Sequence, residues 1–551
     1  MIQTQNAAAP AISRQALFLI LLTLLVYAQA ITFSFLHLDD TVYIVENDAV
    51  HHWSDIPSYF TGKAGERFSA QTAPLLRNLY RPMVSCWILL NYKLFGNHAA
   101  LWRLSAILMY VLSVWLFWRI AWRFSQDNFV ALAASLIYAL HPLHVEGVAW
   151  LAASCVEVLL SVFFLGGFLA YLRWRESRKS IWLLACAVLT LLAFLSKETA
   201  AALPVLIIAH ALLFRSPENQ SQARPIPLMR LSLIMVATAG LYALLRIAAI
   251  HAVVISYAQH NWADMLRTAP RLFVTQLQHA LWPLHLAPWY DVPIVTAAGF
   301  ANFYLPLAMC VAYLSLIVWS VGRKPLVALL LMWWAVTLLP AVAGSITLQD
   351  SGAVQDRFTF LGLAGLSMLA AMALRRLPAL GHSLFGYDAS VALSLAILTV
   401  VLGALSALQV NTWKNDFSMC LNAIAVSPKT LRPRALLGAE FMKHGDPQSA
   451  VAAYRGAVNI DPNQGGLLYP YAVALESAGN RAEAIQTLGR ATQVSPKMAP
   501  AYFVLADLLM KEGRSDEATK VLEGGVRLNP EASILRWQLN QIRLSQQPGL
   551  R

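Results

Sequence analysis

The sequence is poor in charged residues and lacks the common nucleotide-binding and nucleophile motifs. Only 13% of its 551 residues are Asp, Glu, Lys or Arg, whereas 58% are hydrophobic and the mean hydropathy is +0.55. It contains no P-loop, no Gly-rich dinucleotide turn and no nucleophile elbow. The five cysteines stand singly without ligand spacing, which predicts packing residues. These absences argue against a soluble multidomain protein, a nucleotide-driven transporter and an enzyme using soluble sugar nucleotides.

Apolar runs close to the ~20 residues that cross a bilayer dominate the first three quarters of the chain. We predict eleven spans, at residues 15–35, 100–122, 129–150, 154–173, 180–196, 199–215, 230–250, 301–322, 325–343, 358–375 and 388–409. The short apolar run from Pro82 to Phe95 is not counted, because a span there would invert every later orientation. The chain is therefore predicted to be a multi-pass membrane protein.

Basic residues gather at every second junction between these spans, which the positive-inside rule assigns to the cytoplasm. The clusters are Arg123; Arg173, Arg175, Arg178 and Lys179; Arg215, Arg224 and Arg230; Arg323 and Lys324; Arg375 and Arg376. The net charge of +12 thus reflects membrane orientation and predicts no nucleic-acid partner. With a cytoplasmic N-terminus, everything after residue 409 lies outside the cytoplasm, in the periplasm or the lumen. Compact loops favour a bacterial inner membrane.

Two domains follow from this pattern, a membrane domain at residues 1–412 and a second domain at residues 413–551. The first outer loop, 36–99, and a second outer segment, 251–300, mix apolar, aromatic and proline residues without a clean span, so we expect both at the interface. In the second domain, proline recurs every 34 residues at Pro428, Pro462, Pro496 and Pro530. Gly445, Gly479 and Gly513 keep this period, as do Ala450, Ala484 and Ala518. This is the tetratricopeptide pattern, whose concave face usually binds peptide or protein, although a plain stabilising cap is the alternative.

The adjacent carboxylates Asp39 and Asp40, in "LDDTVYIVEN", stand where the first span surfaces. Ionisable groups near hydrocarbon are costly and usually face a cavity or partner, which favours catalysis. One of the two could serve an acceptor while the other binds a metal, the substrate or a structural partner. The alternative is that both cap the following helix through backbone N–H groups.

The remaining polar candidates lie at the outer ends of other spans and predict one polar pocket. In "HPLHVEGVAW", His141, His144 and Glu146 make a thin ligand set, because Pro142 interrupts the helix. Sugar or phosphate binding and a structural histidine pair remain alternatives to a metal.

Three cations on the outer side, Arg81, Lys197 and Arg357, could bind a phosphate. The alternatives are snorkelling of Arg81 to headgroups and pairing inside each motif, Lys197 with Glu198 and Arg357 with Asp356.

The order of "LDDTVYIVENDAV", "YRPM", "HPLHVEGVAW", "SKETA", "LWPLHLAPWYDVP", "QDRFTF" and the 34-residue repeats resembles the transmembrane and tetratricopeptide-repeat O-mannosyltransferase family and its bacterial relatives. The resemblance implies an all-α fold of the GT-C type with about eleven spans, followed by an α-solenoid. It also implies a polyprenyl-phosphate-linked sugar donor and inverting transfer. The chain departs from the family pattern in having "LAASCVEV" after "VEGVAW", and Arg103 in its second span.

Carried onto this sequence, the resemblance implies residue roles. Asp39 would be the general base, assisted by Asp40, and Trp289 and Tyr290 would contact the lipid or sugar. The residues expected to hold the donor phosphate or sugar are Arg81, His141, His144, Glu146, Lys197, Glu198, Asp356 and Arg357.

The leading hypothesis is a membrane glycosyltransferase that moves one sugar from the lipid-linked donor to a protein Ser or Thr hydroxyl. The repeats would present the acceptor protein on their concave face, and membrane lipids would surround the spans. No metal ligand is assigned, and a divalent metal ion stays an open alternative. Transfer to an envelope glycan or lipid, and a non-catalytic membrane scaffold, are the competing hypotheses.

Overall fold

The computed structural model describes residues 14–62, 79–214, 227–250, 262–347, 354–384 and 386–546. Two compact units divide the chain, Met1–Asn415 and Asp416–Arg551. Apart from one antiparallel strand pair, β1 (Ser383–Leu384) and β2 (Tyr387–Asp388), the regular structure in these ranges is helical. The all-α prediction is confirmed. Parts of the two predicted outer segments, 63–78 and 251–261, lie outside the described residues, as do Arg215 and Arg224.

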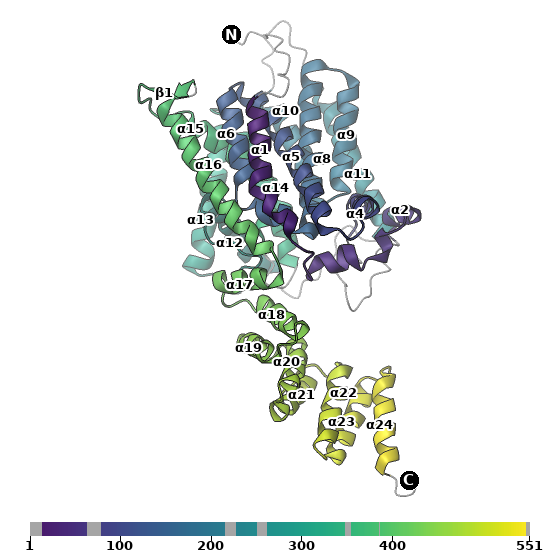
Figure 1. Ribbon diagram of the computed structural model, residues 1–551. Coiled ribbons are helices and arrows are strands. Elements are labelled where there is room, and N and C mark those ends of the chain that lie inside the picture. Colours follow the sequence, from purple (N-terminus) through teal and green to yellow (C-terminus); the bar gives the residue numbers. More distant parts are fainter. Residues whose placement is uncertain are drawn as a thin grey trace. The chain divides into compact units, whose positions relative to one another are not determined.

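The first unit is a bundle of helices (Figure 1). Its α-helices are α1 Arg14–Tyr27, α2 Ile56–Phe60, α4 Pro82–Phe95, α5 Ala99–Ser125, α6 Asn128–Leu140, α7 His144–Ala149, α8 Leu151–Ser177, α9 Ser180–Phe194, α10 Ala202–Leu213, α11 Leu228–Ile250, α12 Trp262–Leu281, α13 Leu305–Val321, α14 Pro325–Thr347, α15 Leu363–Leu374 and α16 Ala389–Val410. Short 3₁₀ or π turns complete it: η1 Ala28–Thr32, η2 Thr41–Val45, η3 Asp48–Val50, η4 Trp53–Asp55, η6 Glu198–Ala201, η7 Phe300–Tyr304, η8 Asp356–Thr359 and η9 Asn411–Trp413.

Each of the eleven predicted spans coincides with helix. Seven helical segments within the described ranges are long and apolar enough to cross a membrane: Arg14–Thr32, Ala99–Ser125, Leu151–Ser177, Leu228–Ile250, Phe300–Val321, Pro325–Ala343 and Ala389–Trp413. Helix α8 packs against α5 and α9, while α14 packs against α10, α13 and α15. Large apolar side chains of α11, α13 and α16 remain exposed, as expected for helices that face lipid. The chain is a multi-pass membrane protein.

Two features depart from regular spans for reasons that the sequence contains. The predicted span 129–150 breaks into α6 and α7 around Pro142, because proline lacks the N–H that a continuing helix needs. Helix α4 has 14 residues and is about 21 Å long. Since the hydrocarbon core is about 30 Å thick, α4 is too short to cross it.

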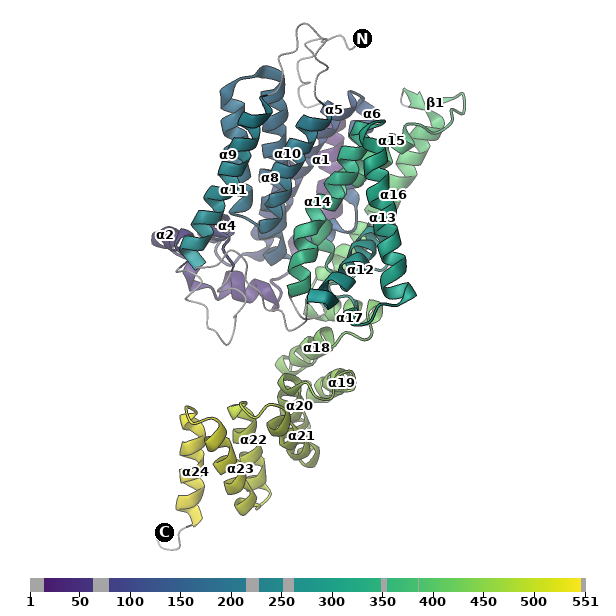
Figure 2. The same cartoon turned by 180° about the vertical axis from the view of Figure 1, so that it is seen from behind.

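The basic junctions meet at one end of the bundle. Arg123, at the end of α5, pairs with Glu176 at the end of α8, with 3.0 Å between Nε and Oε1. Arg375, after α15, pairs with Asp127 before α6, also at 3.0 Å. The segment that carries η2, η3, η4 and α2 lies at the opposite end, in both views (Figures 1 and 2). The bundle therefore separates its cationic junctions from the candidate catalytic residues.

The second unit consists of paired helices. They are α17 Asp416–Val426, α18 Arg432–Lys443, α19 Pro447–Val458, α20 Gly465–Ser477, α21 Arg481–Val494, α22 Ala499–Lys511, α23 Ser515–Leu528 and α24 Ser533–Gln546. Gly445, Gly479 and Gly513 each have φ between 75° and 84°, which glycine adopts without steric cost. The periodic alanines are fully buried at the helix contacts. The predicted tetratricopeptide solenoid is confirmed.

Candidate functional site

The two adjacent aspartates occupy different environments. Asp40 is fully buried, and its carboxylate accepts backbone N–H bonds from Leu36 (3.0 Å) and from Ala152 (2.8 Å), at the start of α8. Burial raises the pKa of Asp40 to about 6, although both N–H groups and the nearby Arg103 lower it. Asp39 is half-buried. Asp40 therefore ties the loop to α8 and does not bond to the N–H groups of η2, as the capping alternative required.

Arg103 fixes the same loop from another side. Its guanidinium, 1% exposed, donates to the carbonyl oxygens of Phe33 (3.1 Å), Ser34 (2.5 Å) and Ala149. Because Ala149 ends α7, Arg103 joins the chain before Asp39 to the segment that carries Glu146. The arginine that departs from the family pattern thus has a structural role here.

All three predicted phosphate-binding cations belong to one cluster of ion pairs, in which Lys197 is buried and Arg81 and Arg357 are half-buried. Lys197 Nζ lies 2.5 Å from Glu157 Oε1, and their side chains are 10% and 4% exposed. Burial lowers the pKa of Lys197, and the charges of Arg81 and Arg357 add to this, against the opposing effect of Glu157.

Glu198 holds two guanidinium groups at once. Arg81 donates to its Oε2 at 3.0 Å, and Arg246, from α11, donates to its Oε1 at 3.1 Å. One carboxylate thus accepts from two guanidinium groups. Lys197 pairs with Glu157 rather than with Glu198, so the alternative of pairing inside the "SKETA" motif is wrong.

Arg357 completes the cluster through Glu146. Its backbone N–H donates to Glu146 Oε2 at 3.1 Å and its Nη1 to Oε1 at 2.5 Å, while its guanidinium lies 4.7 Å from the ring centroid of Trp150. The "QDRFTF" and "VEGVAW" motifs are therefore joined. Arg357 thus pairs with Glu146, and the alternative of a pair with its neighbour Asp356 is wrong.

Two aromatic residues connect these charges. The ring of Phe358 lies 5.4 Å from Lys197 Nζ and 5.8 Å from the Arg357 guanidinium. Burial and the charge of Asp39 raise the pKa of the Tyr43 phenol, in η2. The charges of Arg81 and Arg357 act in the opposite direction, and the net pKa is raised. The structure thus gathers Asp39, Arg81, Lys197 and Arg357 around Tyr43 and Phe358.

The two histidines are engaged with backbone carbonyls. His141 Nε2 lies 3.0 Å from the carbonyl oxygen of Ala280, in α12. His144 Nε2 lies 3.0 Å from the carbonyl oxygen of Phe360, and its Nδ1 lies 2.7 Å from the Tyr110 hydroxyl. Both rings are buried. These contacts favour the structural-pair alternative over a metal or sugar ligand.

Asp356 and Tyr290 form a second buried pair. The Tyr290 hydroxyl donates to Asp356 Oδ1 at 2.6 Å and accepts from the Ala287 N–H at 2.9 Å. Burial and the charge of Glu146 raise the pKa of Asp356 well above its ordinary value, against the opposing effects of the Tyr290 hydrogen bond and the charge of Arg357. Trp289 and Tyr290 are only 3% and 6% exposed. Neither aromatic side chain faces an open surface.

The charge cluster offers poor ligands for a divalent metal ion. Glu146, Glu157 and Glu198 each pair with a cation, so a metal would have to displace Arg357, Lys197 or the two arginines. The donor set fits an anion better, because Arg81 and Arg246 bring two guanidinium groups together at Glu198.

Four participants were not among the predicted site residues: Tyr43, Glu157, Arg246 and Phe358. Glu157 and Arg246 had a detectable signal, since each is an isolated charge within an apolar run. Tyr43 and Phe358 sit inside the quoted motifs, but aromatic residues are too common in this chain to stand out.

Comparison with known proteins adds independent information. The family model "Dolichyl-phosphate-mannose-protein mannosyltransferase" matches residues 80–242, which include Arg81, Glu146, Glu157, Lys197 and Glu198. A tetratricopeptide-repeat model matches residues 441–497 and 477–539.

Several similar proteins carry the name protein O-mannosyl-transferase, and three of them are described here. F38B6.6 of Caenorhabditis elegans is 22% identical over 463 residues, 82% of this chain and 63% of the relative. TMTC3 of Homo sapiens is 28% identical over 26% of this chain and 15% of its own length. Tmtc1 of Drosophila melanogaster is 32% identical over 22% of this chain and 14% of its own length. The chain spans less than two thirds of the length of these relatives.

The two matched regions coincide with the two kinds of structure described above. Residues 80–242 run from the start of α4 into α11, within the helix bundle, and the repeat matches lie within the solenoid. The chain therefore combines a region similar to the mannosyltransferase family model with tetratricopeptide repeats, and its resemblance to the transmembrane and tetratricopeptide-repeat O-mannosyltransferase family is confirmed.

Proposed function

We propose that the protein transfers one sugar, mannose or a related hexose, from a polyprenyl-phosphate-linked donor to a hydroxyl group, in the manner of a GT-C glycosyltransferase. The observation that carries the proposal is a cluster of four ion-paired cations close to the half-buried Asp39. Lys197 and Arg246 are buried, and Arg81 and Arg357 are half-buried. Cations of this kind stabilise the negative charge that develops on a departing phosphate. A carboxylate beside them can accept the proton of the acceptor.

The reaction would proceed in one displacement with inversion. The acceptor oxygen attacks the anomeric carbon of the sugar while its proton passes to Asp39. The bond between that carbon and the phosphate oxygen breaks, and the electron pair leaves with polyprenyl phosphate. Arg81 and Arg246, which converge on the carboxylate of Glu198, are the best-suited cations for this phosphate, because guanidinium groups bind phosphate oxygens with two parallel hydrogen bonds.

Asp40 would assist without touching the substrate. Both of its carboxylate oxygens accept backbone N–H bonds, so its contribution is to hold the backbone of Asp39 in place. In this view the acceptor hydroxyl belongs to a protein Ser or Thr that the concave face of the repeats presents. The repeats and Asp39 would then lie on the same, outer side of a membrane, with the N-terminus in the cytoplasm; a bacterial inner membrane fits the compact loops.

The test is sugar transfer by the purified full chain. Radiolabelled polyprenyl-phosphate sugars are offered with an extract of acceptor proteins, and wild type is compared with Asp39→Asn and Asp48→Asn. Asp48 lies in the same loop and its side chain is fully exposed, which makes it a matched control. We expect at least a ~100-fold loss for Asp39→Asn and wild-type rates for Asp48→Asn.

Three results would change the proposal. Label in protease-resistant glycan would move the acceptor to an envelope polymer. Full activity of Asp39→Asn would remove Asp39 as the base. Absence of transfer from every donor, with wild type folded, would favour the membrane scaffold.

A further inference from the structure

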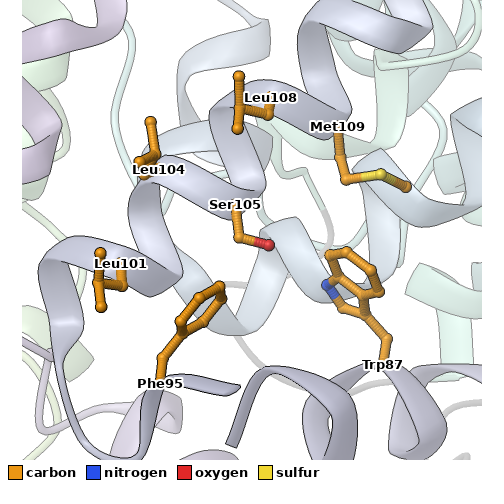
Figure 3. A pocket seen from close by; sticks show the side chains of 7 residues that line it. All are labelled: Trp87, Phe95, Leu101, Leu104, Ser105, Leu108 and Met109. Carbon is orange, nitrogen blue, oxygen red and sulfur yellow. The ribbon is translucent and has the colours of Figure 1, made fainter.

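The indole of Trp150 contacts both the charge cluster and the end of the last span. Its ring centroid lies 4.7 Å from the Arg357 guanidinium and 5.3 Å from the ring centroid of Trp413, with an angle of 11° between the two indole planes. Trp87, by contrast, lines an apolar pocket between α4 and α5 whose lining side chains carry no charge (Figure 3). Trp413 lies in η9, directly after α16. A residue outside the quoted motifs thus stacks on the residue that contacts Arg357.

The stacked pair belongs to the buried interior of the first unit. Trp150 and Trp413 are 5% and 1% exposed. Ser406, about two turns before Trp413 on the same span, donates to the carbonyl oxygen of Leu140 at 2.8 Å. Since Leu140 ends α6, this bond joins the last span to the helix that precedes the "HPLHVEGVAW" segment. The structure therefore fixes Trp413 firmly beside Trp150.

Stacking, and no hydrogen bond, orients the two indole rings. Within the described residues, the buried Nε1 groups of Trp150 and Trp413 have no hydrogen-bond partner. A ring that lacks such a bond is oriented by its neighbours alone, and nearly parallel aromatic rings restrict each other's tilt. Removal of the Trp413 indole would therefore loosen the Trp150 ring.

The orientation of Arg357 depends on that ring. A guanidinium has five N–H donors, and within the described residues its Nη1 bond to Glu146 is the one side-chain hydrogen bond that Arg357 makes. One such bond leaves the plane of the guanidinium able to turn, so the contact with the Trp150 ring helps to set it. The Arg357 side chain is 19% exposed. Its remaining N–H groups can thus meet an anion, in a direction that Trp150 restricts.

We propose that Trp413 is a positioning residue for sugar transfer, which acts through the Trp150 ring to aim the Arg357 guanidinium at the donor phosphate. This inference rests on the proposed function, because it requires that phosphate to meet Arg357. Negative charge grows on the phosphate as the sugar leaves, so a misaimed guanidinium weakens an interaction that is strongest in the transition state. Loss of the stack should therefore lower kcat and leave the KM for the donor nearly unchanged.

The first experiment compares sugar transfer by full-length Trp413→Leu and Trp413→Phe with wild type. We expect kcat to fall roughly 10- to 100-fold in Trp413→Leu, because a displacement of about 1 Å can cost that much. Trp413→Phe keeps an aromatic ring against Trp150 and should retain most of the activity. Equal losses in the two variants, or a loss that appears only in KM, would overturn the proposal.

Trp118→Leu is the matched control for the loss of a buried indole. Trp118 is 3% exposed, and its Nε1 has no partner within the described residues either. It lies 15 residues (118−103) beyond Arg103 on α5, about 22 Å along the helix axis. We expect Trp118→Leu to lower the unfolding midpoint and to keep the wild-type kcat. A fall in kcat equal to that of Trp413→Leu would make the effect a general loosening of the bundle and overturn the proposal.

A double-mutant cycle with Arg357→Lys tests whether Trp413 acts through the guanidinium. Lysine keeps the positive charge but lacks the planar group that Trp150 orients. Trp413→Leu should therefore lower kcat less than ~3-fold further once Arg357 is replaced, whereas independent sites would give the full loss again. Additive losses would overturn the proposal.

A chemical measurement does not depend on catalysis. Phenylglyoxal, which modifies guanidinium groups, is applied to the full-length proteins, and modification of Arg357 is followed by mass spectrometry. We expect its rate to rise at least ~2-fold in Trp413→Leu, the lower bound for loss of one aromatic contact, and to stay at the wild-type value in Trp118→Leu. This rise would support the positioning role even if no sugar transfer is found, which separates it from the proposed function. An unchanged rate in Trp413→Leu would overturn the role of Trp413 even if transfer is observed.

Discussion

The ion pair between Lys197 and Glu157 allows structure and function to be separated for one candidate residue. The pair is almost completely buried, with 2.5 Å between Nζ and Oε1. Removing one partner of such a pair leaves a buried charge without compensation, which costs about 3–5 kcal/mol. We therefore expect Lys197→Met and Glu157→Met each to lower the free energy of unfolding by about that amount.

The double variant should behave differently. With both charges replaced by apolar side chains of similar length, no buried charge remains, and such replacements are often neutral or stabilising by about 1–4 kcal/mol. Unfolding of the full chain in mixed micelles, followed by tryptophan fluorescence, measures all four proteins. Glu517→Gln is the control, because it breaks an exposed Arg514–Glu517 pair and should cost no more than about 1 kcal/mol.

Sugar transfer by the same double variant then decides the role of Lys197. If Lys197 contacts the donor phosphate, lost charge-assisted hydrogen bonding of about 1.5–3 kcal/mol predicts a fall in kcat/KM of roughly 10- to 150-fold, despite restored stability. If its role is only to neutralise Glu157, activity returns with stability. Single variants within about 1 kcal/mol of wild type would refute the buried pair itself, since no buried charge would then have been left unpaired.

Three further perturbations test separate parts of the structure. Burial raises the pKa of Asp40 to about 6, so the folded state binds this proton more tightly than the unfolded chain does. The stability that the bound proton contributes should be lost as pH rises from about 4 through 6. Unfolding midpoints across this range should fall with a slope that Asp40→Asn reduces, and an unchanged slope would contradict the raised pKa of Asp40. In the solenoid, a Cβ added at Gly438 would lie 2.8 Å from a tyrosine ring, whereas one at Gly489 meets nothing within 4 Å. Gly438→Ala should therefore destabilise the repeats by up to about 2 kcal/mol, and Gly489→Ala should stabilise them by about 0.8–1 kcal/mol. Thermal unfolding measures both variants, and changes of the same sign would be inconsistent with this packing. Tyr290→Phe removes the 2.6 Å bond to Asp356 and should cost about 1–3 kcal/mol in the same unfolding assay, where no loss would mean that the pair is not formed.

Much of the fold could be predicted because it depends on local chemistry. The 34-residue period identifies the repeats, since each turn needs a residue such as Gly445 with positive φ and each helix contact needs a small residue such as Ala450. Pro142 predicts the break between α6 and α7 for an equally local reason. Long apolar runs likewise identify helices that can cross a membrane.

The pairing of charges could not be predicted, because it depends on which helices are neighbours. Glu157 is 40 residues from Lys197, and Arg246 is 48 residues from Glu198. Sequence adjacency suggested Lys197 with Glu198, but neighbouring side chains point in different directions and each found a partner on another helix. The sequence did mark both Glu157 and Arg246 as candidates for a buried contact, because each is an isolated charge in an apolar run.

The two adjacent aspartates lead to the sharpest distinction between a positioning role and a chemical one. Asp40 is buried with both oxygens bonded to backbone N–H groups, whereas Asp39 is half-buried and close to Tyr43. Asp40→Asn can keep only one of these bonds in its original sense, because its amide group donates where a carboxylate oxygen accepted. We expect this variant to lose activity because the loop that carries Asp39 is held less firmly. Lower temperature should then restore most of the activity. Asp39→Asn should remain inactive at every temperature, with an unfolding midpoint close to that of wild type. The reverse pattern, a folded and cold-insensitive loss in Asp40→Asn with an active Asp39→Asn, would transfer the base from Asp39 to Asp40.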